Sequence, residues 1–220
     1  LYFVIFGNLI GSRVGPMEGH SFMEFIAPGI IMMSVITNAY SNVVSSFFGA
    51  KFQKHIEEIL VSPTPNYTIL LGYLAGGVGR GLLTGAIVTV IATGFADLRI
   101  HDPWITGSVV FLTAVLFSLG GFINAVFARK FDDISIVPTF VLTPLTYLGG
   151  VFYSISMLPE FWQRLSLINP ILYMVNAFRF GILGTSDIPI GTAYGIIGLF
   201  IVGLAAFSLY LLERGVGLRT

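Results

Sequence analysis

Charged residues divide this chain into long apolar intervals. Residues 25–50, 103–128, 134–159 and 188–212 contain no Asp, Glu, Lys or Arg, and residues 67–96 are interrupted only by Arg80. A helix needs about 20 mainly apolar residues to cross the hydrocarbon core of a bilayer, which is about 30 Å thick. The pattern therefore predicts five membrane-spanning helices, at about residues 25–48, 67–95, 104–127, 135–154 and 189–212.

The start of the chain is apolar but short. Residues 1–11 cover only about half of a membrane, and they show neither a basic segment nor a small-residue cleavage site of the kind that marks a signal peptide. We expect them to be the outer half of a truncated first span, so that the intact protein has six spans and a further N-terminal segment. The continuous apolar runs favour helices over the alternating strands of a membrane barrel.

Basic residues favour one side of this arrangement. Six lie in the connections and tail of one side, namely Lys51, Lys54, Arg129, Lys130, Arg214 and Arg219. Four lie on the other side, namely Arg13, Arg99, Arg164 and Arg179. Because cytoplasmic loops are enriched in Lys and Arg, we expect the first side, with the C-terminus, to face the cytoplasm.

Composition supports a membrane protein and excludes several other classes. The 220 residues are 55% hydrophobic and 10% charged, with a net charge of zero and a mean hydropathy of +0.88. A soluble domain carries about 25% charged residues, and a disordered chain carries more charge and less apolar surface. The neutral balance provides no basic footprint for nucleic acid. With no cysteine, the chain forms no disulfide, zinc–thiolate site or iron–sulfur cluster.

Motifs of catalytic chemistry are missing from the sequence. It contains no GxxxxGKS or GxxxxGKT phosphate loop, no HExxH metal pair and no GxSxG nucleophile elbow. The glycines Gly77, Gly79 and Gly81 lie inside an apolar interval with no preceding strand, so that they favour helix packing over nucleotide binding. We therefore expect no enzyme active site, no metal site and no cofactor in this chain.

An amphipathic helix is predicted at residues 50–61, directly after the first complete span. Apolar side chains recur at helical spacing, and Ser62 and Pro63 end the pattern. The charged side chains on its other faces are Lys51, Lys54, Glu57 and Glu58. Such a helix lies on the lipid headgroups or docks on a cytoplasmic partner, and the pattern by itself leaves both open.

Arg80 lies near the middle of the span at 67–95. An arginine at this depth costs a few kcal/mol, so that it should face a water-filled cavity or bond to a carbonyl or amide. It is either a structural anchor or a residue that lines a pathway. Glycines at four-residue intervals on the same helix, at positions 77, 81 and 85, predict close approach of a neighbouring helix.

Prolines mark the segment that follows. Pro138 and Pro144 should kink the span at 135–154. Two short apolar pieces come next, each too short to cross the membrane, and they predict a re-entrant hairpin at residues 158–180 on the outer side. Trp162 and Tyr173 suit an interfacial depth.

The motifs of this segment resemble the signature of ABC-2 type transport permeases. The residues that carry the resemblance are Pro144, Gly149, Gly150, Pro159, Trp162, Asn169, Pro170 and Arg179. Residues 57–63 resemble the element between the second and third spans of the same family, and the likeness runs along essentially the whole chain.

The resemblance implies an all-α integral membrane protein, a six-span permease similar to type V ABC exporters. Such permeases form dimers, here expected to be homodimers, in the bacterial inner membrane, and each binds a separate ATPase at its cytoplasmic face. That ATPase would bind ATP and Mg, and the helix with Lys51, Lys54, Glu57, Glu58 and Leu60 would couple to it. The external hairpin would help to close the outer end of the path.

Two other functions remain open at this point. The chain could act without an ATPase, as a stand-alone channel or secondary transporter. It could also be a membrane assembly factor without transport. The substrate does not follow from the sequence, because an aromatic content of 14% suits both a sugar-binding path and a lipid-facing surface.

Overall fold

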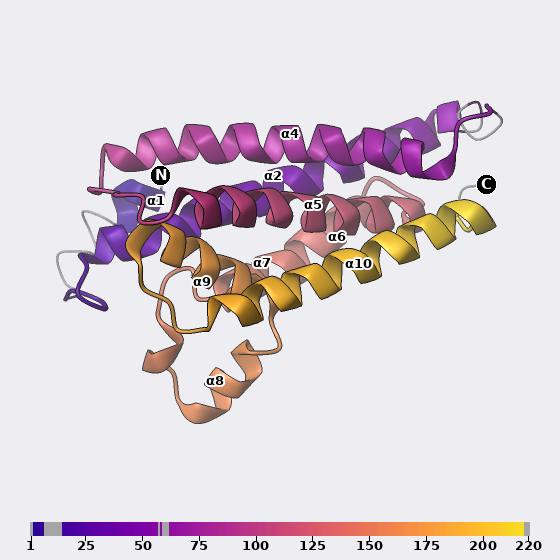
Figure 1. Ribbon diagram of the computed structural model, residues 1–220. Helices are drawn as coiled ribbons and strands as arrows, with labels where there is room; N and C mark the ends of the chain where they lie inside the picture. Colours follow the sequence, from indigo (N-terminus) through magenta and orange to yellow (C-terminus); the bar gives the residue numbers. More distant parts are fainter. Residues whose placement is uncertain (1, 7–14, 57, 59–61, 218–220) are drawn as a thin grey trace.

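The computed structural model describes residues 2–6, 15–56, 58 and 62–217, and the named elements of this part of the chain are all helices, joined by turns and loops (Figure 1). Four helices are long and apolar enough to cross a membrane, namely α2 (Phe22–Phe52), α4 (Asn66–Thr93), α5 (Pro103–Phe127) and α10 (Ile190–Arg214). They correspond to four of the five predicted spans. The chain is therefore a multi-pass membrane protein.

Helix α2 is the centre of the bundle. It packs against α4, α5 and α9, and most of its apolar side chains are buried within the chain. Its start is set locally, because the Ser21 hydroxyl accepts from the backbone N–H of Glu24 while the Glu24 carboxylate accepts from the backbone N–H of Ser21. Helix α5 is buried to a similar extent, whereas α4 and α10 leave most of their apolar surface for lipid or a partner.

Glycines bring α4 close to the core. A methyl group at Gly77 would collide with Ser118 of α5 and Val43 of α2, and one at Gly85 would lie 2.7 Å from Val35. Only a residue without a Cβ allows this approach. The close packing predicted from the glycine spacing is confirmed.

The predicted span at 135–154 is a shorter, irregular helix. It consists of α6 (Asp133–Val137), the π-helical segment η2 (Pro138–Leu142) and α7 (Thr143–Tyr147), after which the chain turns. The wider π turn accommodates Pro144, which has no N–H to donate to the turn before it. Gly150, with φ +72°, closes the turn in the left-handed region that favours glycine. The prolines thus widened the helix, and it ends earlier than expected.

The predicted hairpin contains two helices joined by a sharp bend. These are α8 (Glu160–Ser166) and α9 (Pro170–Leu183), which meet at 90°. Helix α9 is buried against α2 and α5, whereas α8 projects from the bundle with Trp162 46% exposed. Counted as one bent span, the pair would bring the described spans to five. Six spans are not reached in the described residues.

Little of the predicted half-span at 1–11 falls within the described residues. Its described helical part is α1 (Tyr2–Val4). Nearby rings attach it to the bundle, since Phe3 stacks on Phe95 and Phe6 stacks on Phe152. The truncated first span therefore stays a prediction.

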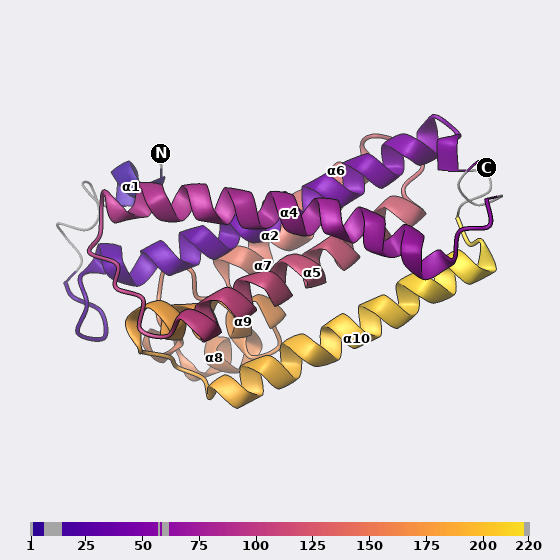
Figure 2. The ribbon, with the colours of Figure 1, turned by 45° about the horizontal axis from the view of Figure 1, so that its top comes forward.

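The helices alternate in direction, which gathers most basic residues at one end (Figure 2). The connection from α2 to α4, the connection after α5 and the end of α10 all lie at this end, together with Lys51, Lys54, Arg129, Lys130 and Arg214. We call it the basic end. The connections from α4 to α5 and from α9 to α10 lie at the opposite end. The arrangement predicted from the charge-free intervals is confirmed for these connections.

Candidate functional site

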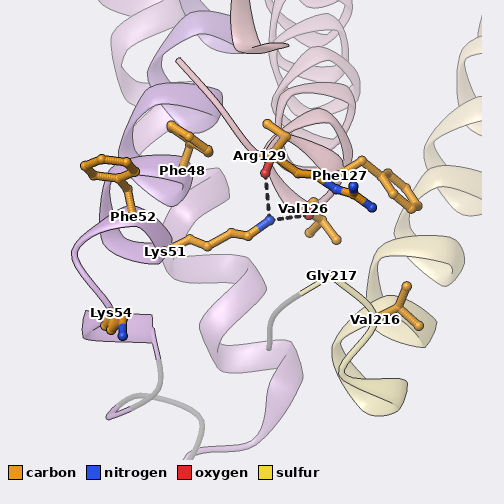
Figure 3. Close-up of a pocket in the computed structure, with 10 residues that line it drawn as sticks. Phe48, Lys51, Phe52, Lys54, Val126, Phe127, Arg129, Val216 and Gly217 are labelled. Atoms are coloured by element: carbon orange, nitrogen blue, oxygen red, sulfur yellow. Dashed lines mark hydrogen bonds between the residues drawn. The ribbon is translucent and has the colours of Figure 1, made fainter. Parts of the chain in front are cut away.

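A cavity of about 700 Å³ lies at the basic end, between the ends of α2 and α5 and the residues that follow α10 (Figure 3). Its apolar walls include Phe48, Phe52, Phe127 and Val216. Three cationic side chains also line it, namely Lys51, Lys54 and Arg129. Two of these three, Lys51 and Lys54, belong to the coupling residues predicted from the sequence.

Lys51 turns inward instead of lying on an exposed polar face. Its side chain is 8% exposed, and the ammonium donates to the carbonyl oxygens of Val126 at 2.6 Å and Ala128 at 2.8 Å. These carbonyls belong to the end of α5, where the helix has unpaired acceptors and a partial negative charge. Lys51 therefore caps α5, and its predicted role in coupling to an ATPase stays a prediction.

The predicted helix at 50–61 is interrupted near its start. Helix α2 ends at Phe52, and Lys54 has a φ of +64°, a conformation that L residues rarely adopt. Lys54 is exposed at this break, and beyond it Ile56 is buried and Glu58 is exposed. Glu57 and Leu60 lie outside the described residues. A coupling role for this segment stays a prediction.

A carboxylate next to the cavity is held by the backbone. The Asp133 Oδ2 accepts from the N–H groups of Arg129 at 2.8 Å and Lys130 at 3.0 Å. These two bonds, followed by the positive charges of the same residues, hold the pKa of the Asp133 carboxyl below its usual value. The interaction fixes the turn between α5 and α6 on which Arg129 stands.

Arg80 lies on the outer surface of α4, away from α2. The side chain is exposed, and within the described part of the chain it has no hydrogen-bond or ion-pair partner. The carbonyl or amide partner expected for it is not found among the described residues. Exposure to hydrocarbon at this depth would cost a few kcal/mol. A charge at this depth requires water or a polar partner, which the described residues do not supply.

Arg179 of the predicted external signature is a buried anchor. It is 1% exposed, and its guanidinium lies 3.9 Å from the centre of the Phe25 ring. Its Nη2 donates to the Gly150 carbonyl at 2.6 Å and its Nε to the Phe25 carbonyl at 3.3 Å. One side chain thus connects α9, α2 and the turn after α7, in a setting where a charged group needs such partners.

Asn169 and Gly149 complete this set of contacts around Arg179, which we call the joint. The Asn169 Oδ1 accepts from the N–H of Ile171 at 3.0 Å and so caps α9, whose first residue is Pro170. Its Nδ2 donates to the Leu145 carbonyl of α7 at 2.6 Å. A methyl group at Gly149 would lie 2.8 Å from the Ile171 side chain. The structure therefore brings together five of the signature residues, namely Gly149, Gly150, Asn169, Pro170 and Arg179.

The other three signature residues take no part in these hydrogen bonds, although Trp162 lines a pocket together with Asn169 and Leu145. Pro144 is in α7, Pro159 directly precedes α8, and Trp162 is on the exposed part of α8. The motif thus combines a buried joint with a projecting helix. A role in closing the outer end of a path stays a prediction for all eight residues.

Two polar residues that the sequence analysis did not select support the joint. The Asp187 carboxylate accepts from the Ser154 hydroxyl at 2.8 Å and from the N–H of Ile155 at 3.2 Å, and it attracts the charge of Arg179. The buried Asn176 accepts from the N–H of Asp187 at 3.1 Å. An asparagine inside the apolar run at 165–178 was the available signal, because a buried amide requires partners.

The described residues also lack a candidate metal site. They contain no group of three or more His, Asp or Glu side chains that could hold a metal ion. The polar contacts described above serve to hold helices together or to cap their ends. The geometry therefore suits a membrane bundle with a basic, cavity-bearing end and a buried joint at the opposite end.

Comparison with known proteins connects this architecture to a family. Residues 1–183 match the model of the family described as ABC-2 type transporter. The chain is similar to the inner membrane transport permease YadH of Escherichia coli, with 59% identity over 220 residues that cover 100% of this chain and 86% of the relative. It is also similar to Nodulation protein J of Rhizobium meliloti, with 24% identity over 219 residues that cover 97% and 82%. The chain belongs to the ABC-2 type transporter family.

Proposed function

We propose that this chain is the permease subunit of an ATP-driven exporter in the inner membrane of a bacterium. The observation that carries the proposal is the family match over residues 1–183 of a chain without a phosphate loop. A separate ATPase subunit would bind ATP and Mg, so that this chain is itself no enzyme and holds no cofactor.

The ATPase would dock at the basic end. The connection at residues 53–65 leaves the bundle there, with Lys54 and Glu58 exposed, and Glu57 and Leu60 would belong to the same contact. The positive bias of this end favours a cytoplasmic position. When two ATPase subunits close, they would push on this connection. Because α2 is the central helix and enters the connection directly, the push would reach the whole bundle.

A second copy of the chain would complete the path. Helices α4 and α10 leave most of their surface uncovered, and Arg80 lies unpaired on that surface in the described residues. We place Arg80 on the wall of a water-filled path between two copies. The joint around Arg179 and the projecting α8 would close the outer end of that path.

The ATPase contact can be tested by charge reversal. In the complete permease, Glu57→Lys together with Glu58→Lys should reduce co-purification of the ATPase subunit, because two attractive charges become repulsive. The matched control is Glu160→Lys, at an exposed carboxylate of the opposite end. Size-exclusion chromatography of the variant in detergent verifies that the spans remain folded.

Two results would contradict the proposal. Undiminished co-purification of the Glu57→Lys, Glu58→Lys variant would remove the docking contact from this segment. Transport by the purified permease without any ATPase would support a stand-alone channel or secondary transporter instead.

A further inference from the structure

The cavity at the basic end carries an excess of positive charge. Lys51, Lys54 and Arg129 line it, and none of the described lining residues is acidic. Lys51 and Arg129 line the same cavity, and their like charges repel each other. The neighbouring Asp133 carboxylate accepts from two backbone N–H groups and attracts the positive charge of Arg129, but it forms no ion pair with Arg129 or Lys51 in the described chain. An anion in the cavity would relieve this repulsion.

One of the three cations is fixed before any ligand arrives. Lys51 is held by the carbonyls of Val126 and Ala128, which use two of its three ammonium protons and leave one. Lys54 is exposed on the turn after α2, and Arg129 stands on the turn after α5. Figure 3 shows Lys51 reaching across from α2 to the end of α5, where Arg129 follows. The cavity thus has one cation, Lys51, that is held in place before a ligand binds, and two cations on turns, Lys54 and Arg129, that can adjust to the ligand.

The remaining walls are apolar and include two aromatic rings that are largely exposed. Phe52 is 61% exposed and Phe127 is 53% exposed, and both lie at the ends of membrane-spanning helices. Side chains at such ends meet the boundary between hydrocarbon and headgroups. A free inorganic ion would gain nothing from contact with the rings of Phe52 and Phe127. A ligand that combines a phosphate with acyl chains would contact both the cations and the rings.

We propose that this cavity binds the phosphate headgroup of an anionic phospholipid from the leaflet at the basic end, with its acyl chains along Phe52 and Phe127. Clusters of Lys and Arg at this level of a membrane attract anionic lipids. The bound lipid would bridge α2, α5 and the residues after α10. The proposal depends on the membrane position of these helices but not on export or on an ATPase.

Native mass spectrometry of the complete, delipidated permease tests this site. Phosphatidylglycerol should be retained in preference to phosphatidylcholine with the same acyl chains. Arg129→Gln should weaken phosphatidylglycerol binding about fivefold, and Arg129→Gln with Lys54→Gln about 25-fold, because each cation near the surface contributes about 1 kcal/mol. Arg129→Lys, which keeps the charge, should bind nearly as well as the unchanged chain. Lys51 is left intact because it also caps α5.

The matched control is Lys130→Gln, which removes one positive charge from the same turn but does not line the cavity. It should leave phosphatidylglycerol binding nearly unchanged. An equal loss in Lys130→Gln would reduce the effect to diffuse attraction and overturn the site. Equal retention of phosphatidylcholine would also overturn it, as would displacement of the lipid by inorganic phosphate. If Arg129→Gln does not fold, Lys54→Gln on the exposed turn decides the question, and unchanged binding there contradicts the proposal.

The ATPase is the other candidate occupant of this end, and the same variants separate the two. Loss of ATPase co-purification with unchanged lipid binding would assign the cavity to the ATPase and overturn the lipid site. Loss of lipid binding with unchanged co-purification supports the lipid site, and it leaves the charge-reversal test of Glu57 and Glu58 independent.

Discussion

At the residue scale, two basic side chains have internal partners. Lys51 bonds to carbonyls that lie more than 70 positions later in the chain, and Arg179 bonds to the carbonyl of Phe25, which lies on a different helix. From hydropathy alone, Lys51 and Arg179 would both be assigned to the surface. Their partners are backbone carbonyls, which occur at every residue, so no sequence pattern identifies them.

Removing the guanidinium of Arg179 should destabilise the protein. Arg179→Met leaves the buried carbonyls of Gly150 and Phe25 without their donor and removes the contact with the Phe25 ring, which should cost about 2–4 kcal/mol. The measurement is thermal unfolding of the purified permease in detergent. Arg164→Met is the control, since its exposed pair with Glu160 is long, at 4.0 Å, and worth less than about 1 kcal/mol. Lost transport with unchanged stability would instead favour a gating role.

At the element scale, α4 has two different faces. Gly77, Gly81 and Gly85 face the core, where added methyl groups would meet α2 and α5. Gly79 and Arg80 lie on the exposed face, and a methyl group at Gly79 would meet nothing within 4 Å. The four-residue spacing of the first three glycines predicted the contact correctly. The direction of Arg80 followed only from the position of the helix in the bundle.

The packed face can be tested with a matched pair of substitutions. Gly77→Val forces methyl groups against Val43 and Ser118 and should cost about 1–3 kcal/mol. Gly79→Val adds the same atoms to the same helix, but the new side chain points into open space. Any effect of valine on helix propensity is therefore the same in both variants. Unfolding midpoints in detergent should differ between the two variants. Equal unfolding midpoints for the two variants would contradict the packing of Gly77 against α2.

At the scale of the whole molecule, the fold separates a buried core from an uncovered surface. Helices α2 and α5 are mostly buried, while α4 and α10 present apolar side chains outward. Arg80 is the exception on the uncovered surface, because it is charged and lies in the middle of its span. A path between two copies would supply the water that this side chain requires.

Cysteine accessibility can detect that water, because the chain contains no cysteine of its own. Leu83→Cys, one helical turn from Arg80 and 63% exposed, should react with a water-soluble thiol reagent in the assembled permease. Val202→Cys is the control on α10, where Val202 is 68% exposed and we expect lipid. Arg80→Leu should then lower transport without affecting membrane insertion. If neither cysteine reacts, or transport is unchanged, Arg80 does not line a path.

Much of the fold could be predicted from the sequence, because membrane insertion and helix capping depend on residues near one another in the chain. Apolar length located α2, α4, α5 and α10, and the Asn169-Pro170 pair marked the start of α9. The alternation of spans also placed most basic residues at one end. In each case the signal lies within one helix or one turn.

The remaining features were decided only by the tertiary structure. The inward turn of Lys51, the break at Lys54, the joint around Arg179 and the outward direction of Arg80 all depend on which segments pack together. Hydropathy sums the properties of neighbours in the chain, whereas a buried charge is stabilised by atoms that neighbour it in space. The sequence by itself therefore determined that this protein crosses the membrane and where. Only the packing of the helices decided which charges hold the bundle together and which remain free for a ligand or a partner.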